Sequence, residues 1–197
     1  MIDKNIIVGI LWAGYCIVHS LMAAPSFKKR IEILFGKAYK YYRLFYNLFA
    51  TATLAAIIIY QLSFPSPVLF KINLFIQILA GIVITTGLII MGICIRKYFI
   101  QESGLLWLNP GNSKPKIELQ ITGIHKIVRH PLYLGTFIFA WGLFILFPAV
   151  SLLIADGIIT IYTLIAIKFE EKKLLKEFGQ VYKDYQRKVP MIIPHLR

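Results

Sequence analysis

Cysteine and acidic side chains are both scarce in this chain of 197 residues. Only two cysteines occur, Cys16 and Cys94, and both lie inside apolar runs. The sequence therefore predicts neither a disulfide framework nor a metal site of paired cysteines, and both residues are expected to be packing residues. The sequence also contains no other cluster of residues with the spacing of metal ligands, so no bound metal is expected.

The nine acidic residues are outnumbered by 22 basic ones, which gives a formal net charge of +13. Such a charge is typical of proteins that bind nucleic acid through phosphate contacts. Here, however, 20 of the 22 basic residues lie in three segments just outside apolar runs. The positive-inside bias of membrane proteins and the attraction of anionic lipids explain that placement. We therefore expect membrane lipids, and no nucleic acid, as partners.

Long apolar runs make up most of the sequence. Hydrophobic residues account for 58% of the chain, whereas soluble domains are typically about half apolar. The runs approach the length of about 20 residues that a helix needs to cross a bilayer. The expected fold is an all-α, polytopic membrane helix bundle that forms a single domain, residues 1–197. Its five predicted transmembrane helices are residues 6–24, 44–62, 69–95, 132–147 and 149–167.

The basic segments also predict how this bundle is oriented. Lys and Arg number six in residues 25–43, six in 96–130 and eight in 168–197. With five spans all three segments fall on one side of the membrane, whereas an even number would divide them between both sides. We therefore expect a multi-pass protein of the bacterial inner membrane, with its N-terminus outside and its C-terminus in the cytoplasm.

Two polar segments are expected to lie at the cytoplasmic face. Residues 98–130 contain several glycines and prolines that interrupt helices, so they are predicted to form the one substantial loop. After the fifth span, apolar residues recur at helical spacing, which predicts an amphipathic C-terminal helix over residues 169–187.

The loop brings a cation, an imidazole and a phenol to the start of the fourth span, in Arg129, His130 and Tyr133. Taken alone, these residue types are ordinary anchors at a membrane interface, where arginine, histidine and tyrosine are common. Chemistry at this position would therefore require a partner from elsewhere in the chain.

Glu170 and Glu171, just beyond the fifth span, are the candidate partners. Solvated acids paired with neighbouring lysines would be the ordinary explanation. Glu171, however, shares a helical face with Leu174 and Phe178, which directs its carboxylate toward the packed side of the helix. A carboxylate so placed needs a cation. The fourth and fifth spans form a hairpin, so both clusters reach the same membrane face and can converge.

These residues carry a resemblance to the membrane methyltransferase superfamily, which includes isoprenylcysteine carboxyl, phospholipid N- and methanethiol S-methyltransferases. The resemblance covers residues 119–194 and depends on an ordered combination of motifs. These are the stretch 120–135, Phe169-Glu170-Glu171, Phe178-Gly179, Tyr182, Tyr185, Val189-Pro190 and Pro194. The segment from His19 to Pro25 and residues 189–194 look most like the methanethiol S-methyltransferase and NnrU-like branch.

The resemblance implies S-adenosylmethionine as cofactor, and Arg129 and Glu171 as catalytic residues. The backbone of residues 120–123 would approach the nucleoside. The family commonly has tyrosine where this chain has His125. The residues implied to bind the cofactor are Gln120, Thr122, Gly123, His125, Arg129, His130, Tyr133, Gly135, Glu170 and Glu171.

The expected reaction is S-methylation of a small or lipophilic thiol in the membrane. Alternatives are isoprenylcysteine-type carboxyl O-methylation, phospholipid N-methylation, and a non-catalytic role as an NnrU-like membrane protein. A nicotinamide-dependent reductase is a further rival, because the C-terminal part of membrane sterol reductases resembles this superfamily. No dinucleotide glycine fingerprint follows a strand in the sequence, which disfavours that rival.

Two further polar residues lie inside predicted spans. His19 is expected to be a hydrogen-bonded structural residue rather than a ligand or base. Asp156, near the outer end of the fifth span, is expected to reach interfacial water and is left outside the candidate site.

Overall fold

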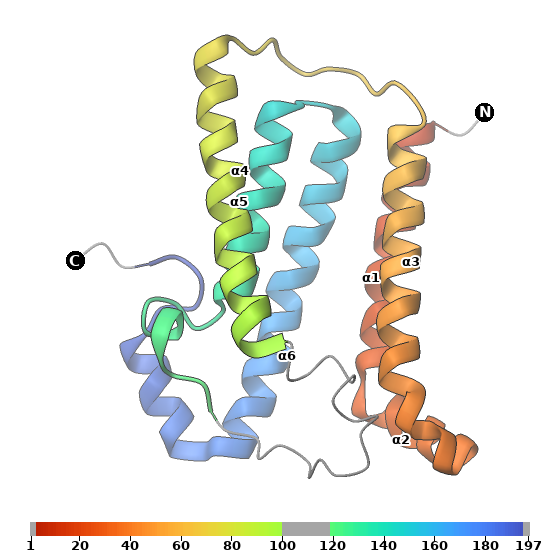
Figure 1. Ribbon diagram of the computed structural model, residues 1–197, viewed down its shortest axis with the longest axis vertical. Coiled ribbons are helices and arrows are strands. Elements are labelled where there is room, and N and C mark those ends of the chain that lie inside the picture. The colour runs from red at the N-terminus through yellow and green to blue at the C-terminus, as the bar shows by residue number, and fades with distance from the viewer. Residues whose placement is uncertain (1–2, 100–118, 195–197) are drawn as a thin grey trace.

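The computed structural model describes residues 3–99 and 119–194, so most of the predicted loop over residues 98–130 lies outside the described residues. Long helices lie side by side along the long axis of the molecule (Figure 1). They are α1 (Lys4–Ala23), α3 (Tyr42–Leu62), α4 (Leu74–Cys94), α5 (Pro131–Leu146) and α6 (Val150–Lys188), and the shorter helix α2 (Pro25–Phe35) lies at one end of the bundle. Short helical turns cover Gly36–Tyr41, Ile95–Phe99 and Gly123–Lys126.

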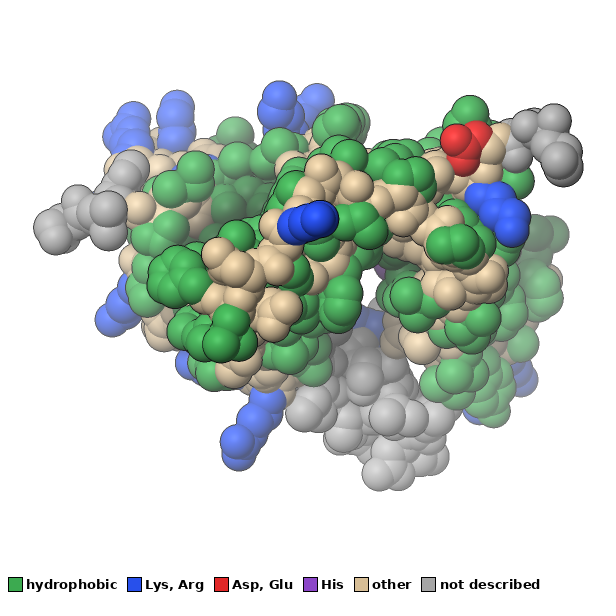
Figure 2. Space-filling view, turned by 90° about the horizontal axis from the view of Figure 1, so that it is seen from above, with side chains coloured by type: hydrophobic (Ala, Val, Ile, Leu, Met, Phe, Trp, Pro, Cys, Tyr) green, Lys and Arg blue, Asp and Glu red, His purple; other side chains and the backbone are tan. Residues whose placement is uncertain are grey.

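The lengths and compositions of these helices confirm a helical membrane bundle. Four apolar segments of the described chain are long enough to cross a bilayer: Lys4–Ala23, Pro25–Leu62, Leu74–Lys97 and Val150–Lys188. Large apolar side chains such as Leu62, Phe75 and Ile161 are 62–78% exposed. Seen from above, hydrophobic side chains cover much of the visible surface (Figure 2). The apolar side chains exposed along the helices suit hydrocarbon, and the chain is an integral membrane protein.

Helix α5 occupies the predicted fourth span but has only 16 residues. At 1.5 Å per residue it is about 24 Å long, less than the ~30 Å of a bilayer core. Glycines let it pack closely on α4. A Cβ atom on Gly87 would lie 2.6 Å from the Phe139 nitrogen, and one on Gly135 would lie 2.9 Å from Met91 Cγ. Helix α5 therefore has a protein neighbour along one side, and the count of five spans stays a prediction.

Helix α4 corresponds to the third predicted span. It begins at Leu74, five residues later than the predicted start at residue 69. Asn73 caps it, because its Oδ1 accepts a hydrogen bond of 2.9 Å from the Ile76 nitrogen. The preceding residues are extended and pair with the α5–α6 turn. The Leu69 nitrogen donates to the Pro148 carbonyl at 2.8 Å, and the Val150 nitrogen donates to that of Pro67 at 3.0 Å.

The fifth span and the start of the C-terminal helix, predicted as separate elements, are continuous in α6, whose 39 residues form two helical parts that meet at Gly179. Hydropathy falls at Lys168, but residues 168–178 are good helix formers and contain neither proline nor glycine, so the helix continues. Its one break is Gly179, where φ is 54° and ψ is −125°. Glycine adopts such a conformation without steric cost. The break redirects the last part of α6 at the end of the bundle, as Figure 1 shows.

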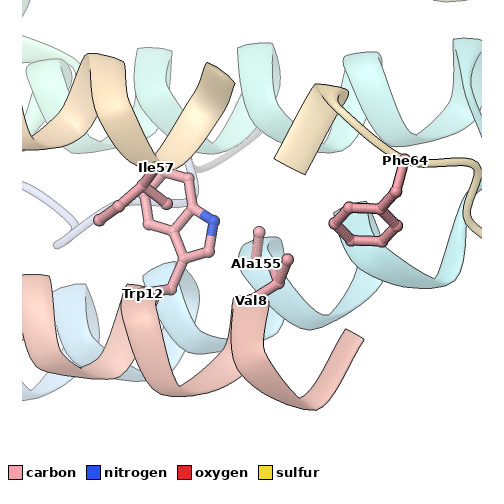
Figure 3. Close-up of a cluster of buried hydrophobic side chains, with 5 residues drawn as sticks. All are labelled: Val8, Trp12, Ile57, Phe64 and Ala155. Atoms are coloured by element: carbon pink, nitrogen blue, oxygen red, sulfur yellow. The ribbon is translucent and has the colours of Figure 1, made fainter. Parts of the chain in front are cut away.

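A cluster of buried side chains joins α1 and α3 to α6. Its members are Val8, Trp12, Ile57, Phe64 and Ala155 (Figure 3). The Trp12 indole nitrogen donates a hydrogen bond of 2.8 Å to Gln61 Oε1 within it. Because α1 packs on both α3 and α6, it connects the N-terminal helices to the rest of the bundle.

The arrangement of the connections agrees with the predicted two-sided topology. The chain between α3 and α4, the α5–α6 turn and the start of α1 lie at one end of the bundle (Figure 1). Helix α2, residues 119–130 and the C-terminal part of α6 lie at the opposite end. The described parts of the three basic segments therefore share one end, and the orientation of the bundle in the membrane stays a prediction.

Asp156 differs from its prediction. Instead of reaching interfacial water, it is only 3% exposed, and its Oδ2 has no hydrogen-bond partner among the described residues. A buried, unsatisfied polar atom costs about 1–3 kcal/mol. We expect Asp156→Leu, which removes this atom, to raise the thermal unfolding temperature in detergent without changing ligand binding. Asp184→Leu, at a position beyond Gly179 where the side chain is 48% exposed, is the control. A loss of stability in Asp156→Leu would contradict the expectation.

Candidate functional site

The candidate site lies at the end of the bundle where α5 begins and where α6 has passed Lys168. Arg129 is held there by the segment that follows the Gly179 break. Its Nη1 donates to the carbonyl oxygens of Gln186 and Val189, at 3.1 and 2.6 Å. The Arg129 backbone nitrogen donates to the Pro190 carbonyl at 2.8 Å. Sequence reasoning missed these carbonyl partners.

Arg129 and Glu171 form a direct ion pair. The Arg129 Nε lies 2.7 Å from Glu171 Oε1, and the two side chains are 11% and 16% exposed. His130 Nε2 lies 3.1 Å from the same oxygen, and Gln186 Nε2 donates to Oε2 at 3.0 Å. Both carboxylate oxygens are therefore bonded. The two sequence clusters converge, and the carboxylate points to the packed side.

Glu170 has a different environment, although it is the next residue. It is 44% exposed, and its Oε2 accepts a hydrogen bond of 3.1 Å from the Tyr133 hydroxyl. The Tyr133 ring stacks on that of His130, with centroids 5.7 Å apart and planes inclined by 26°. The adjacent carboxylates thus differ in their surroundings: Glu171 is enclosed by Arg129, His130 and Gln186, whereas Glu170 is partly exposed.

Two tyrosines of α6 complete the packed side of the site. The Tyr185 hydroxyl donates a hydrogen bond of 2.6 Å to the His125 carbonyl. Tyr182 is 1% exposed, and its hydroxyl lies close to Glu171 without forming a hydrogen bond of acceptable geometry among the described residues. An unsatisfied hydroxyl inside a polar cluster is a candidate ligand contact.

His125 connects the short turn Gly123–Lys126 to the arginine. Its Nδ1 lies 3.1 Å from the Arg129 carbonyl. Burial lowers the pKa of His125 below the ordinary value for histidine, nearby His130 and Lys97 act in the same direction, and the bond to the Arg129 carbonyl opposes them. At neutral pH the imidazole is therefore uncharged and adds no positive charge to the site.

The other predicted cofactor residues lie outside the charged cluster. Gln120, Thr122 and Gly123 are exposed, and Gly123 has a φ of 62°, which begins the turn before Arg129. Gly135 faces α4, where its missing side chain lets Ile90 and Met91 approach. The roles of these four residues in binding a cofactor stay predictions.

No group of three or more metal-ligating side chains occurs within residues 3–97 and 119–194. His19 is bonded instead to a phenol. The Tyr46 hydroxyl lies 2.9 Å from His19 Nε2, and the imidazole lies between the rings of Tyr15 and Tyr46, at 5.6 and 5.2 Å. These contacts fit the structural role expected for His19.

The fold and the site together define a helical membrane protein with a buried ion-pair cluster at one end of its bundle. Comparison with known families agrees with the resemblance seen in the sequence. The family model described as phospholipid methyltransferase matches residues 71–181, more than half of the chain. The chain belongs to this family, which confirms a methyltransferase scaffold.

Individual relatives match a shorter part of the chain. Methanethiol S-methyltransferase 2 of Bradyrhizobium diazoefficiens is 46% identical over 76 residues, covering 37% of this chain and 27% of the relative. Methanethiol S-methyltransferase of Crocosphaera subtropica is 39% identical over 80 residues, covering 41% and 31%. Protein-S-isoprenylcysteine O-methyltransferase of Schizosaccharomyces pombe is 34% identical over 111 residues, covering 55% and 47%.

The matches thus span less than half of the length of these curated relatives. No solved structure matches the chain.

Proposed function

We propose that this protein transfers a methyl group from S-adenosylmethionine to a thiol at the cytoplasmic face of the membrane. The observation that carries the proposal is the cluster of Arg129, His130 and Glu171 beside the open carboxylate of Glu170, on a methyltransferase-family scaffold. Relatives named methanethiol S-methyltransferase support a thiol as the acceptor.

The chemistry of the side chains fits this methyl donor. Its ammonium group suits Glu170, which is partly exposed and bonded to Tyr133. Its carboxylate suits Arg129, whose Nη2 takes part in none of the three bonds that hold the guanidinium. When bound, the donor supplies an electrophilic methyl group on a sulfonium, which tolerates the neighbouring faces of Tyr133 and His130.

The residues of this chain would act mainly by alignment. Methyl transfer is a displacement, so holding donor and acceptor in line lowers the barrier more than acid–base assistance does. A thiol reacts as its thiolate and needs only a modest fall in pKa. We assign to Arg129 and Glu171 the placement of the donor. Residues 120–123 are proposed to approach its nucleoside, with His125 and the turn before Arg129 shaping that side. Gly135 would act indirectly, by letting α5 pack closely on α4.

The proposed orientation places this site in the cytoplasm, where a soluble donor is available. It follows from the basic segments, which share the end of the bundle that carries the site. A lipophilic or volatile acceptor would arrive through the bilayer. The non-catalytic alternative is disfavoured because Arg129 and Glu171, the residues implied to be catalytic, are both present and form an ion pair.

Carboxyl O-methylation is the second candidate, supported by the relative from Schizosaccharomyces pombe, which matches the largest share of this chain among the three relatives described above. A carboxylate acceptor would compete with Glu170 and Glu171 for the same cations, which favours the thiol.

The proposal is tested by titrating S-adenosylhomocysteine into the detergent-purified protein in a calorimeter. We expect a Kd in the micromolar range, about −8 kcal/mol. Transfer of a labelled methyl group to methanethiol, and not to a prenylated cysteine carboxylate or phosphatidylethanolamine, would then identify the acceptor class. Absence of binding to the folded wild type would reject the methyltransferase activity and favour the non-catalytic alternative.

A further inference from the structure

A groove between α1 and α6 opens on the side of the bundle, apart from the charged cluster. Its volume is about 290 Å³, and none of its eight lining residues carries a charge. Ile17 and Leu21 of α1 and Ile165 and Phe169 of α6 form exposed walls. Small molecules bind in concave, mostly apolar sites that hold a few placed polar groups.

The groove contains one such polar point. The Ser20 hydroxyl donates a hydrogen bond of 2.9 Å to the Tyr162 hydroxyl, and both side chains line the groove. Inside a membrane, polar side chains are costly, and they mark substrate pathways more often than lipid-facing surface. The pair can orient a small polar atom that enters an otherwise apolar space.

The groove also leads to the proposed methyl-transfer site. Phe169, at one end, directly precedes Glu170 in α6. Glu170 also lies four residues, about one helical turn, beyond the lining residue Ala166, so these two side chains share a face of α6. A molecule beside Ala166 therefore lies about one turn of α6 from the Glu170 carboxylate, which is proposed to hold the methyl donor.

We propose that this groove binds the methyl acceptor, and that the acceptor is a small uncharged thiol that enters from the hydrocarbon layer. The inference depends on the proposed function and deepens it by assigning the acceptor class and its site. The absence of charge in the lining carries that assignment. An acceptor with a carboxylate or an ammonium group would leave that charge unpaired in an apolar space. Four of the eight lining residues belong to α1 and precede the segment that resembles the methyltransferases, so the groove adds α1 to the functional part of the molecule.

Two substitutions test the proposal: one fills the groove with a larger side chain, and the other widens the groove. Ala166→Trp places a large ring among the lining residues, whereas Ile161→Trp places the same ring on a lipid-exposed position of α6 outside the lining. We expect Ala166→Trp to raise the KM for methanethiol at least tenfold and to leave the Kd for S-adenosylhomocysteine within twofold of wild type. Ile161→Trp should change neither.

Ile165→Ala widens the groove with little risk to folding, because Ile165 is 50% exposed. Relative to wild type, the ratio of kcat/KM for hexanethiol to that for methanethiol should rise about tenfold, since one methylene of fit is worth roughly 10–200-fold. If Ala166→Trp does not fold, the thiol preference of Ile165→Ala alone tests whether the groove binds the acceptor.

Each outcome has a definite reading. Unchanged thiol kinetics in both variants, with S-adenosylhomocysteine still bound, would overturn the acceptor site and leave the proposed function standing, with a lipid chain as the occupant of the groove. Weaker S-adenosylhomocysteine binding in Ala166→Trp would make the groove part of the donor site and would also overturn the inference. Failure of the wild type to bind S-adenosylhomocysteine would remove both proposals.

Discussion

Replacing Glu171 by Ala is expected to weaken S-adenosylhomocysteine binding at least 100-fold and to lower the unfolding temperature. The change leaves the Arg129 guanidinium, 11% exposed, without its counter-charge, and it leaves the imidazole of His130, 5% exposed, without its carboxylate partner. Removing one partner of a buried ion pair typically costs about 3–5 kcal/mol. Calorimetric titration and thermal unfolding in the same detergent measure the two effects.

A double variant separates ligand binding from folding. Arg129→Leu with Glu171→Leu removes both charges, so the unfolding temperature should recover toward that of wild type while binding stays lost. Asp184→Ala is the surface control, because Asp184 and Arg187 form an exposed pair at 3.5 Å, and such pairs contribute little. Wild-type binding by the double variant would show that the Arg129–Glu171 pair has no part in holding the donor.

The second large effect is expected at the contact between α4 and α5. Gly87→Ala adds a methyl group 2.6 Å from the Phe139 nitrogen and 2.8 Å from the Gly135 oxygen, both backbone atoms that cannot move aside alone. Overpacking of this kind costs about 1–3 kcal/mol or more. We expect a clear fall in unfolding temperature and, because α5 begins at Pro131 beside the site, weaker donor binding.

The same helix provides a matched control for this prediction. Gly81 and Gly92 also belong to α4, and a Cβ atom there would meet nothing within 4 Å. Gly81→Ala and Gly92→Ala should be neutral or slightly stabilising, because alanine favours a helix by up to about 1 kcal/mol over glycine. Equal behaviour of Gly87→Ala and Gly81→Ala would contradict a close α4–α5 contact.

Much of the helical architecture could be predicted because local chemistry marks the helix ends. Pro131 stands at the first turn of α5, and Pro148 follows its end. The continuity of α6 could not be read from hydropathy, which reports the membrane boundary and not the end of a helix. The break of α6 at Gly179 could not be predicted either, because the presence of a glycine in the sequence does not show whether its φ is positive in the structure.

The charged site was partly predictable for a similar reason. A carboxylate on the apolar face of a helix requires a cation, and this requirement pointed from Glu171 to Arg129. The carbonyl partners of Arg129 at Gln186 and Val189 depend on how the chain turns after Gly179, which is a property of the tertiary structure. The burial of Asp156 likewise depends on how α6 is rotated against its neighbours, which its distance from the span's end does not reveal.

The position of α1 has a consequence for how this protein can diversify. The family model covers α4, α5 and α6 as far as Val181, whereas α1, α2 and α3 precede it. The N-terminal helices meet that segment along α6, through α1. Substitutions on the α6-facing surface of α1 could therefore change which acceptor is used while leaving the inherited ion-pair cluster untouched. Chimeras that exchange only residues 1–70 between relatives offer a direct route to new acceptor preferences.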